Sequence, residues 1–413
     1  MITAPSVGTL DPLMQALEED LTRLRDRDLF RSLTTIEEVR GATVRVGGRW
    51  LVLWCANDYL GLSMHPEVVQ AACEATRRWG VGARASRLLA GSTSLHAELE
   101  EHLASFFHTE AAVVFSSGYL ANLGTLSALL STEDVVLVDR LAHASLIEAC
   151  RASRAAFRVF HHNDADHVRT LLERYPTARR RLVVTEGMFS MDGDLAPLSQ
   201  LLQVVQSHDA VLYVDDAHAA FVLGATGRGS PEAAGVSHNA LIYMGTLSKA
   251  LGCQGGFVAG SQSLIEFLRN RARTFIYATA LAVPVVAAAS EALRLANDDP
   301  TLRRRVWRNA QHLHERLSRF GGLRNRAPSH IVPVSVGSSR RARELSSMLI
   351  SRGMFVPAIR PPTVPSGTAR LRISVSALHT EEQLTQLANA LHELLTSENS
   401  KLQVPPAPTC ISL

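Results

Sequence analysis

The chain has 413 residues, more than one hydrophobic core usually supports, so we expect one large domain and one smaller domain. Hydrophobic residues make up 46% and charged residues 20%, which is typical of a globular protein and excludes the disordered and fibrous classes. The 42 basic and 39 acidic side chains are interspersed and leave a net charge of +3, which gives no support for nucleic-acid binding.

The cysteines and the apolar segments predict a soluble cytoplasmic protein. The five cysteines are odd in number, widely spaced and without a Cys-x-x-Cys pair, so we predict neither a disulfide framework nor a metal site. The N-terminal segment lacks the basic and apolar regions of a signal peptide. The apolar run 278–289 is too short to cross a bilayer, so we expect no membrane partner.

In chain order, the first predicted element is a helix that begins at Asp11-Pro12 and carries leucines at helical spacing. Between residues 56 and 285, short Val-rich runs alternate with amphipathic helical patterns. This alternation predicts a large α/β domain with a mainly parallel sheet covered by helices. The predicted strands of this domain are 111–115, 135–139, 157–161, 181–186, 210–216, 240–245 and 255–260.

Residues 286–396 predict a smaller C-terminal α+β domain. Its expected elements are long helices over 286–319, strands at 331–337, 354–359 and 371–376, and helices near 340–352 and 380–396. Residues 1–55 form the N-terminal helix and a lead-in segment, and the proline-rich stretch 397–413 is predicted to be a disordered tail. Its last four residues fit a prenylation pattern, with a plain disordered terminus as the alternative.

Three polar clusters follow predicted strands, and the first is FSSGYLAN (115–122). It opens a helix, so the backbone amides of Gly118 and Tyr119 would point at an anion such as a phosphate. An ordinary strand-to-helix turn that needs a small residue is an equally good interpretation of this segment alone.

The second cluster, VDDAH (214–218), ends an apolar strand with two acids and a histidine. Such a group is costly to bury unless each charge has a partner. Asp215 could keep a pyridinium nitrogen protonated, and His218 could form a hydrogen bond with a ring hydroxyl oxygen. A metal site or a buried salt bridge is the alternative.

The third cluster, GTLSKALG (245–252), places Lys249 among small and hydroxyl residues with no acid nearby in sequence. Such a lysine can have a lowered pKa and act as a nucleophilic amine, and a surface lysine at a turn is the alternative. The three clusters together are far more specific than any one of them. A phosphate turn is followed by Asp-x-x-His at a strand end, and the lysine comes 249 − 215 = 34 residues after Asp215.

This arrangement resembles fold-type-I enzymes that use pyridoxal-5′-phosphate (PLP), and the chain from about residue 15 to 395 resembles the α-oxoamine synthases. The resemblance implies a mainly parallel sheet covered by helices, a smaller α+β domain, and a homodimer with shared active sites. The segments that carry it are ANDYLGLSMHP (56–66), GARASRLLAGSTSLHAELE (82–100), DRLAHASL (139–146), HND (162–164), VTEGMFSMDGDLAPL (184–198) and GTLSKALG.

The resemblance also implies a role for each matching residue. Lys249 would hold PLP as a Schiff base, Asp215 would pair with the ring nitrogen, His218 with the ring oxygen, and His143 would stack on the ring. The remaining implied contacts are the phosphate with Gly118, Tyr119, Thr246 and the neighbour's Thr279, the cofactor with Ser190, the amino-acid carboxylate with Asn57 and Arg372, and the acyl substrate with Arg31, Arg360 and Thr363. As alternatives, His143 could be an ordinary helix-start residue, and Arg31 and Arg360 could be solvated cations.

Segments 27–31 and 359–374 most resemble the branch of the family that serves biotin biosynthesis. The implied reaction is a decarboxylative Claisen condensation of L-alanine with a pimeloyl thioester of CoA or acyl carrier protein. Glycine with acetyl-CoA or succinyl-CoA, and serine with a long-chain acyl thioester, would use the same core residues. A catalytically silent scaffold would have lost the lysine or its partners, and all of them are present.

Two positions depart from the pattern of the family. Phe221 occupies a position that is usually glycine, so we expect a change in the shape of the acyl pocket. Cys55 and Ala56 replace the more usual serines, and we interpret both as packing changes because Asn57 is retained.

Overall fold

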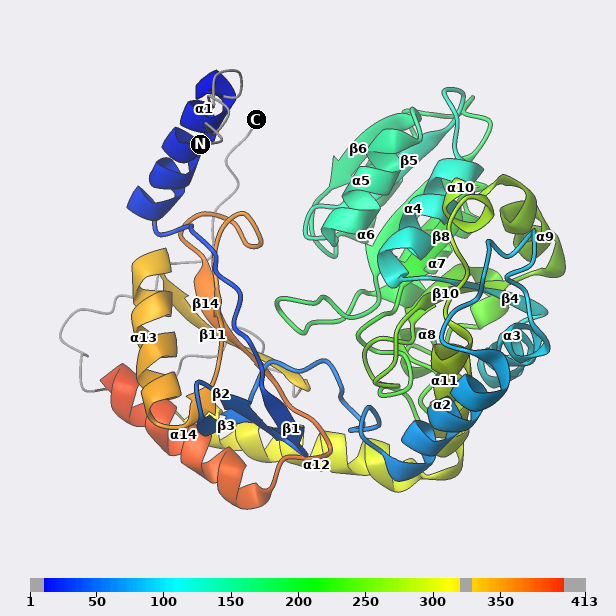
Figure 1. Cartoon of the computed structure of the whole chain (residues 1–413). Helices are drawn as coiled ribbons and strands as arrows, with labels where there is room; N and C mark the ends of the chain where they lie inside the picture. The colour runs from blue at the N-terminus through cyan, green and yellow to red at the C-terminus, as the bar shows by residue number, and fades with distance from the viewer. Residues whose placement is uncertain (1–10, 320–328, 397–413) are drawn as a thin grey trace, which may run out of the picture.

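The computed structural model describes residues 11–319 and 329–396, and in it the chain forms two lobes beside a projecting N-terminal helix, α1 (Asp11–Asp26) (Figure 1). The predicted tail 397–413, with its prenylation pattern, lies outside the described residues. No helix in the described part of the chain is long and apolar enough to cross a membrane.

A seven-stranded sheet forms the centre of the larger lobe, in the order β4-β10-β9-β8-β7-β5-β6. The strands from β9 to β6 are parallel, and β10 is antiparallel to both of its neighbours. The predicted mainly parallel sheet is therefore confirmed. The strands are β4 (Ala111–Phe115), β5 (Val135–Asp139), β6 (Ala156–Phe160), β7 (Arg181–Glu186), β8 (Val211–Asp215), β9 (Ile242–Thr246) and β10 (Gly256–Gly260).

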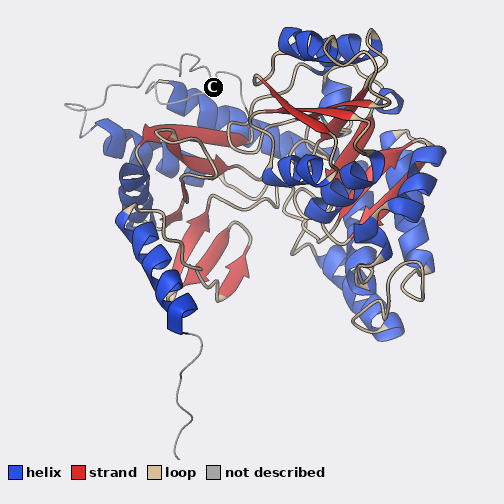
Figure 2. Ribbon diagram, turned by 90° about the horizontal axis from the view of Figure 1, so that it is seen from above, coloured by secondary structure: helices blue, strands red, loops and turns tan. Residues whose placement is uncertain are grey.

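Helices cover both faces of this sheet (Figure 2). In β5, Val135 and Leu137 join one hydrophobic core, while Val136 and Val138 join the other, as the two-residue period of a strand requires. This explains why the strands read as continuous apolar runs. The helices of this lobe are α2 (Pro66–Trp79), α3 (Ser94–Phe107), α4 (Gly118–Leu129), α5 (Ala144–Ala152), α6 (Ala165–Leu172), α7 (Leu198–Gln206), α8 (Ser230–Ala233), η1 (His238–Ala240), α9 (Gln262–Arg271), α10 (Arg273–Ile276) and α11 (Val283–Asp298).

The smaller lobe combines a three-stranded antiparallel sheet, in the order β11-β14-β13, with helices. Pro357 lies between β12 and β13, so the predicted strand 354–359 is split in two. The elements are α12 (Pro300–Ser318), β11 (Ile331–Gly337), α13 (Ser339–Ser351), β12 (Met354–Phe355), β13 (Ala358–Ile359), β14 (Ala369–Ser374) and α14 (Glu381–Thr396).

The lead-in segment contains three strands that the sequence patterns did not predict: β1 (Glu38–Arg40), β2 (Thr43–Val46) and β3 (Arg49–Leu53). They form a four-stranded sheet with β12, which runs parallel to β3. The lead-in segment therefore shares a sheet with the C-terminal part of the chain. The predicted domain boundaries after residues 55, 285 and 396 stay a prediction.

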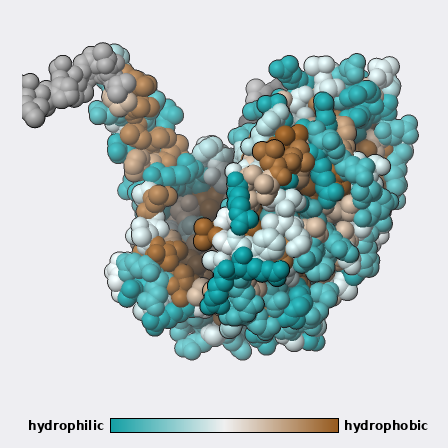
Figure 3. Space-filling model, turned by 45° about the vertical axis from the view of Figure 1, so that its right-hand side comes forward, coloured by the Kyte–Doolittle hydropathy of each residue, from teal (hydrophilic) through white to brown (hydrophobic). Residues whose placement is uncertain are grey.

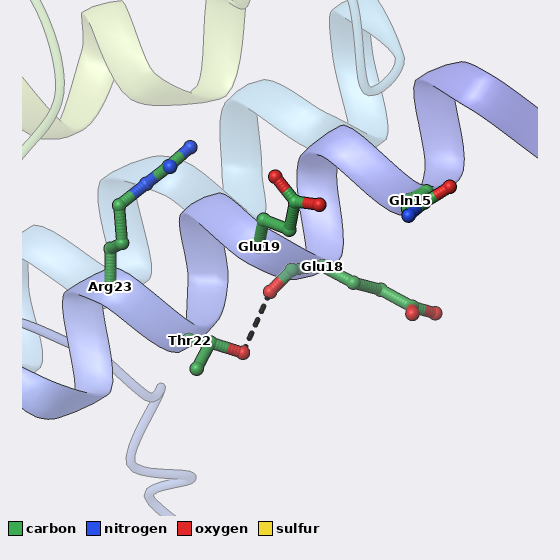
Figure 4. Close-up of a pocket in the computed structure, with 5 residues that line it drawn as sticks. All are labelled: Gln15, Glu18, Glu19, Thr22 and Arg23. Carbon is green, nitrogen blue, oxygen red and sulfur yellow. Dashed lines mark hydrogen bonds between the residues drawn. The ribbon is translucent and has the colours of Figure 1, made fainter.

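Helix α1 is amphipathic, and its apolar stripe is largely uncovered. Four leucines at helical spacing are exposed, and Figure 3 shows the apolar band along the projecting helix. The polar face carries a shallow hollow in which the Thr22 hydroxyl donates to the carbonyl oxygen of Glu18 at 2.8 Å (Figure 4). An uncovered apolar stripe of this kind is typical of a contact with another molecule. The leucines are Leu13, Leu17, Leu21 and Leu24.

Candidate active site

The predicted catalytic residues meet at the carboxyl edge of the large sheet, where α/β enzymes place their ligands. Asp215 is the last residue of β8, and Thr246 is the last residue of β9, with Lys249 three residues further on. Glu186 ends β7 and is the direct register partner of Asp215. Adjacent parallel strands thus deliver two carboxyl groups and a lysine to one place.

Two donors hold the carboxylate of Asp215. Its Oδ1 accepts a hydrogen bond from the backbone N–H of Ala217 at 3.0 Å, and its Oδ2 accepts one from Asn122 Nδ2 at 2.7 Å. Only 6% of Asp215 is exposed. The orientation of this carboxylate is therefore fixed before any ligand arrives.

Lys249 is partly buried, and its burial lowers the pKa of the amine below the usual lysine value. The charges of Asp215 and Glu186 oppose this shift, while that of Arg372 adds to it. A larger fraction of the amine is therefore unprotonated near neutral pH than in an exposed lysine. This is the state that a nucleophile needs.

His218 is buried and forms a hydrogen bond with the hydroxyl of Tyr59, at 2.7 Å from Nδ1. Burial, together with the charges of Lys249 and Arg372, lowers the pKa of His218 well below the ordinary histidine value, so the ring is neutral. The Tyr59 hydroxyl also lies 3.2 Å from Asn57 Oδ1. Tyr59 thereby joins the predicted carboxylate-binding Asn57 to the predicted ring partner His218.

Arg372 reaches this group from β14 of the smaller lobe. Its Nε donates to the carbonyl oxygen of Ser190 at 2.6 Å, Nη1 to Ser374 Oγ at 2.8 Å, and Nη2 to the Tyr59 hydroxyl at 3.4 Å. All of these acceptors are neutral, although the arginine is only 6% exposed. A planar guanidinium held in this way is suited to a carboxylate ligand.

The first turn of α4 forms a cradle against the sheet. A Cβ atom on Gly256 would lie 2.5 Å from the Cα of Gly118, so only glycine permits this close approach of β10 to the helix start. A Cβ on Gly118 would lie 3.5 Å from Thr246 Oγ1, which places that hydroxyl beside the turn. Ser117 caps the helix by accepting from the N–H of Leu120. The free amides of a helix start beside a hydroxyl suit a phosphate.

His143 is the N-cap residue of α5, and its Nδ1 accepts from the backbone N–H of Ser145 at 3.2 Å. Burial lowers the pKa of His143, and the charges of Asp215 and Lys249 act in opposite directions. Its ring meets that of Tyr119 edge to face at a centroid distance of 6.5 Å. The Tyr119 hydroxyl in turn forms a hydrogen bond with Glu148.

Together these groups fit PLP. The phosphate cradle at α4, the carboxylate at the end of β8, the neutral His143 and His218, and the amine of Lys249 supply one partner for each polar part of the cofactor.

The predicted acyl-binding residues form a second group on the smaller lobe. Arg360 donates to the carbonyl oxygens of Asp28 and Phe30, and Arg31 donates to that of Pro361 at 3.3 Å. The N–H of Thr363 donates to the carbonyl oxygen of Arg360. The structure thus brings Arg31, Arg360 and Thr363 together, and their role stays a prediction.

Thr279 lies beside the phosphate cradle of its own chain. Its carbonyl oxygen accepts from Ser116 Oγ at 2.9 Å, two residues before Gly118, and it pairs with Ser86 in a β-bridge. The predicted contact of Thr279 with the neighbour's phosphate site stays a prediction.

Phe221 belongs to a hydrophobic core cluster of the larger lobe, and its effect on the acyl pocket stays a prediction. Its ring is fully buried and packs against Phe106 and Phe107 at 5.4 Å and Phe257 at 6.2 Å. Its backbone has φ +67°, a conformation that explains why glycine suits this position. The ring therefore fills part of this hydrophobic core.

Sequence reasoning missed three residues of the site: Tyr59, Glu186 and Asn122. Glu186 had a usable signal, because it ends a predicted strand next to the one that ends at Asp215. Asn122 lies four residues after Gly118, on the same face of α4. Tyr59 had no comparable signal, because its contact with His218 joins positions that are 159 residues apart.

Comparison with known proteins agrees with this geometry. A family model for aminotransferase class I and II matches residues 50–391. The chain belongs to this family, in its α-oxoamine synthase branch. PLP is the cofactor of this branch, and the structure has the corresponding fold.

Curated relatives and solved structures narrow the comparison. The chain is 45% identical to 8-amino-7-oxononanoate synthase of Geobacter sulfurreducens over 381 residues, which cover 92% of this chain and 97% of the relative. It is also 45% identical to the enzyme of that name from Anaeromyxobacter dehalogenans, over 94% of this chain and 96% of the relative. A serine palmitoyltransferase from S. paucimobilis with bound PLP and myriocin superposes with a TM-score of 0.89 at 32% identity, covering 95% of this chain and all of the other.

Proposed function

We propose that this α-oxoamine synthase condenses L-alanine with a pimeloyl thioester to give 8-amino-7-oxononanoate, carbon dioxide and the free thiol. The near-full-length identity of about 45% to enzymes of that name carries the choice of substrates. The placement of Lys249, Asp215 and Arg372 around one edge supports the reaction type.

Bound PLP supplies an electron sink for negative charge at the Cα of the amino acid. Asp215 would keep the proton on the ring nitrogen of bound PLP, and His218 and His143 would orient its ring. Arg372 and Asn57 hold the substrate carboxylate, which fixes the Cα hydrogen in front of Lys249. The Lys249 amine, with its lowered pKa, removes that hydrogen as a proton.

The condensation then forms one C–C bond and breaks one C–S bond. A bond forms between Cα and the acyl carbon as the C–S bond of the thioester breaks, and the departing thiolate takes up a proton from solvent. The substrate carboxylate leaves as carbon dioxide, and Lys249 returns a proton to Cα. Arg372 itself is held by neutral acceptors, so its positive charge is available to bind the substrate carboxylate until that group leaves as carbon dioxide.

The proposal includes a homodimer with shared active sites, in which Thr279 serves the neighbour's phosphate site. Arg31, Arg360 and Thr363 face the acyl substrate, which CoA or an acyl carrier protein delivers. We infer a cytosolic location, which is supported by free thiols at the four described cysteines.

A crossed substrate panel tests the proposed function. Alanine, glycine and serine are combined with pimeloyl, acetyl, succinyl and palmitoyl thioesters, and thiol release gives kcat/KM for each pair. We expect the alanine and pimeloyl pair to be preferred. A preference for serine with palmitoyl thioester would support the alternative suggested by the serine palmitoyltransferase structures and would contradict the biotin assignment.

A further inference from the structure

Asn122 lies on α4 beside the carboxylate of Asp215 and is only 1% exposed. Its Nδ2 donates to Asp215 Oδ2 at 2.7 Å and to Ser145 Oγ at 2.9 Å. Its Oδ1 accepts a hydrogen bond from the hydroxyl of Tyr213 at 2.7 Å. Both ends of the buried amide are therefore satisfied, and through them α4 is joined to α5 and to β8.

Only one orientation of the Asn122 amide gives every one of these bonds a donor and an acceptor. If the amide were turned over, Oδ1 would face the carboxylate of Asp215, and two acceptors would meet without a hydrogen. In the observed orientation, the Tyr213 hydroxyl donates to Asn122 Oδ1. Ser145 Oγ accepts from Asn122, so its own hydrogen is free to reach His143 Nδ1 at 2.8 Å.

The same chain fixes the tautomer of His143. Its Nδ1 accepts from both the hydroxyl and the backbone N–H of Ser145. A neutral His143 therefore carries its hydrogen on Nε2. The two residues expected to contact the PLP ring, Asp215 at its nitrogen and His143 on its face, are thus connected through one amide.

We propose that Asn122 is a positioning residue that joins Asp215 and His143 into one directional hydrogen-bond chain and holds both in the orientation and charge state that bound PLP requires. The inference rests on the PLP chemistry of the proposed function, but not on which acyl thioester is used. Tyr213 and Ser145 are the two supporting members of the chain.

The ionisable groups around the chain are consistent with this role. Burial and the charge of Asp215 raise the pKa of Glu186 on β7 well above its usual value, so this carboxyl group holds a proton more readily than an exposed glutamate does. Burial raises the pKa of Cys150 on α5 to about 12. The charges of Asp215 and Arg372 act on the pKa of Lys249, and those of Lys249 and Arg372 act on the pKa of His218. Asn122 is the side-chain donor to the Asp215 carboxylate.

Asn122→Leu in the full-length chain tests the inference through PLP binding and absorbance. Removing a donor from a carboxylate should weaken PLP binding by about tenfold or more. Without this donor the Asp215 carboxylate takes up a proton more readily, so the ring nitrogen is less positive. The Schiff-base nitrogen between Lys249 and PLP then keeps its proton to higher pH. The pH at which the visible absorbance of the bound cofactor changes should therefore rise by about half a pH unit or more.

Asn309→Leu is the matched control, because Asn309 is also buried and donates two hydrogen bonds, to the carbonyl oxygens of Ser376 and His379. It should lower thermal stability without moving the absorbance titration. Tyr213→Phe removes one oxygen only and should cause a smaller change of the same sign, which keeps the test usable if Asn122→Leu does not fold.

The inference is overturned if the Asn122 and Asn309 variants have equal PLP affinities and equal absorbance titrations. If Asn122→Leu does not fold, it is overturned when Tyr213→Phe changes neither the PLP affinity nor the absorbance titration. An error in the proposed acyl substrate would show only in the substrate panel. The PLP affinity and the absorbance titration are measured without the amino acid and without the acyl thioester, so they test the inference separately.

Discussion

At the scale of single residues, the charge of Asp215 affects both the cofactor and Lys249. Asp215→Asn keeps the shape of the side chain but removes the charge, so we expect PLP still to bind while turnover falls by about 10²–10³-fold. The Asp215 charge raises the pKa of Lys249, so its removal lowers that pKa further. The half-point for PLP attachment to the apoprotein should therefore move to lower pH.

Steady-state assays and a pH series of PLP incorporation measure these two effects. Borohydride reduction followed by peptide mapping should place the label on Lys249 in both proteins. Near-normal turnover of Asp215→Asn would remove Asp215 from its proposed role, and a label on another lysine would contradict the role of Lys249.

Phe221 provides a second residue-scale prediction, in which ring packing and backbone strain can be separated. Phe221→Ala removes a fully buried ring and should lower the free energy of unfolding by about 3–5 kcal/mol. Phe221→Gly leaves a similar cavity but relieves the strain of a side chain at φ +67°, so it should be about 1 kcal/mol more stable than the alanine variant. Denaturant unfolding measures both values, and an alanine variant more stable than the glycine variant would contradict the strain argument.

At the scale of elements, His162 joins the ends of β5 and β7. Its Nδ1 lies 3.0 Å from Asp139 on β5, and its Nε2 lies 2.7 Å from Asp194 in the loop after β7. Burial alone would lower the pKa of His162, but its hydrogen bonds to the two carboxylates outweigh burial and raise it to about 10. The ring is therefore a cation between two anions in the folded protein.

Because the pKa of His162 is higher in the folded protein than in the unfolded chain, its contribution to the free energy of unfolding decreases as the pH rises. The stabilisation from His162 should be complete below its unfolded pKa of about 6.5 and should be lost as the pH rises through about 10. We expect His162→Gln to lower the free energy of unfolding by about 2 kcal/mol at pH 6 and by much less at pH 10. The value at pH 6 allows for screening by solvent, because the side chain is partly exposed. Unfolding free energies across this pH range, with the exposed His102→Gln as control, measure the effect. A pH-independent difference would contradict it.

The sequence predicted elements well where one local signal dominates. The Val-rich runs at 111–115, 135–139 and 181–186 coincide with β4, β5 and β7, because a strand buried on both faces is apolar throughout. Strands β1 to β3 were missed, because their residues are only partly buried and show no such run. Likewise, strand ends revealed Asp215 and Lys249, whereas the contacts of Tyr59 and Asn122 depend on tertiary packing between distant segments.

At the scale of the whole molecule, apolar side chains remain uncovered next to the site. Leu89 is 81% exposed, Val81 80% and Tyr277 71%. The segments that carry them lie together, because Ser86 pairs with Thr279, whose carbonyl oxygen accepts from Ser116. This apolar patch therefore adjoins the phosphate cradle that begins at Gly118. Patches of this kind on a single chain mark a protein interface.

If a second copy of the chain covers this patch, dimer formation and PLP binding should be coupled. Leu89→Asp places a charge in the proposed interface, so we expect sedimentation velocity to show a shift toward monomer and PLP titration to show at least about tenfold weaker binding. Met348→Asp is the control, because Met348 is 40% exposed on α13 and away from the cradle. It should leave the dimer and the PLP affinity unchanged. The shared-site proposal would be wrong if the wild-type chain were a monomer that kept full activity at high dilution, since Thr279 could then serve only its own chain.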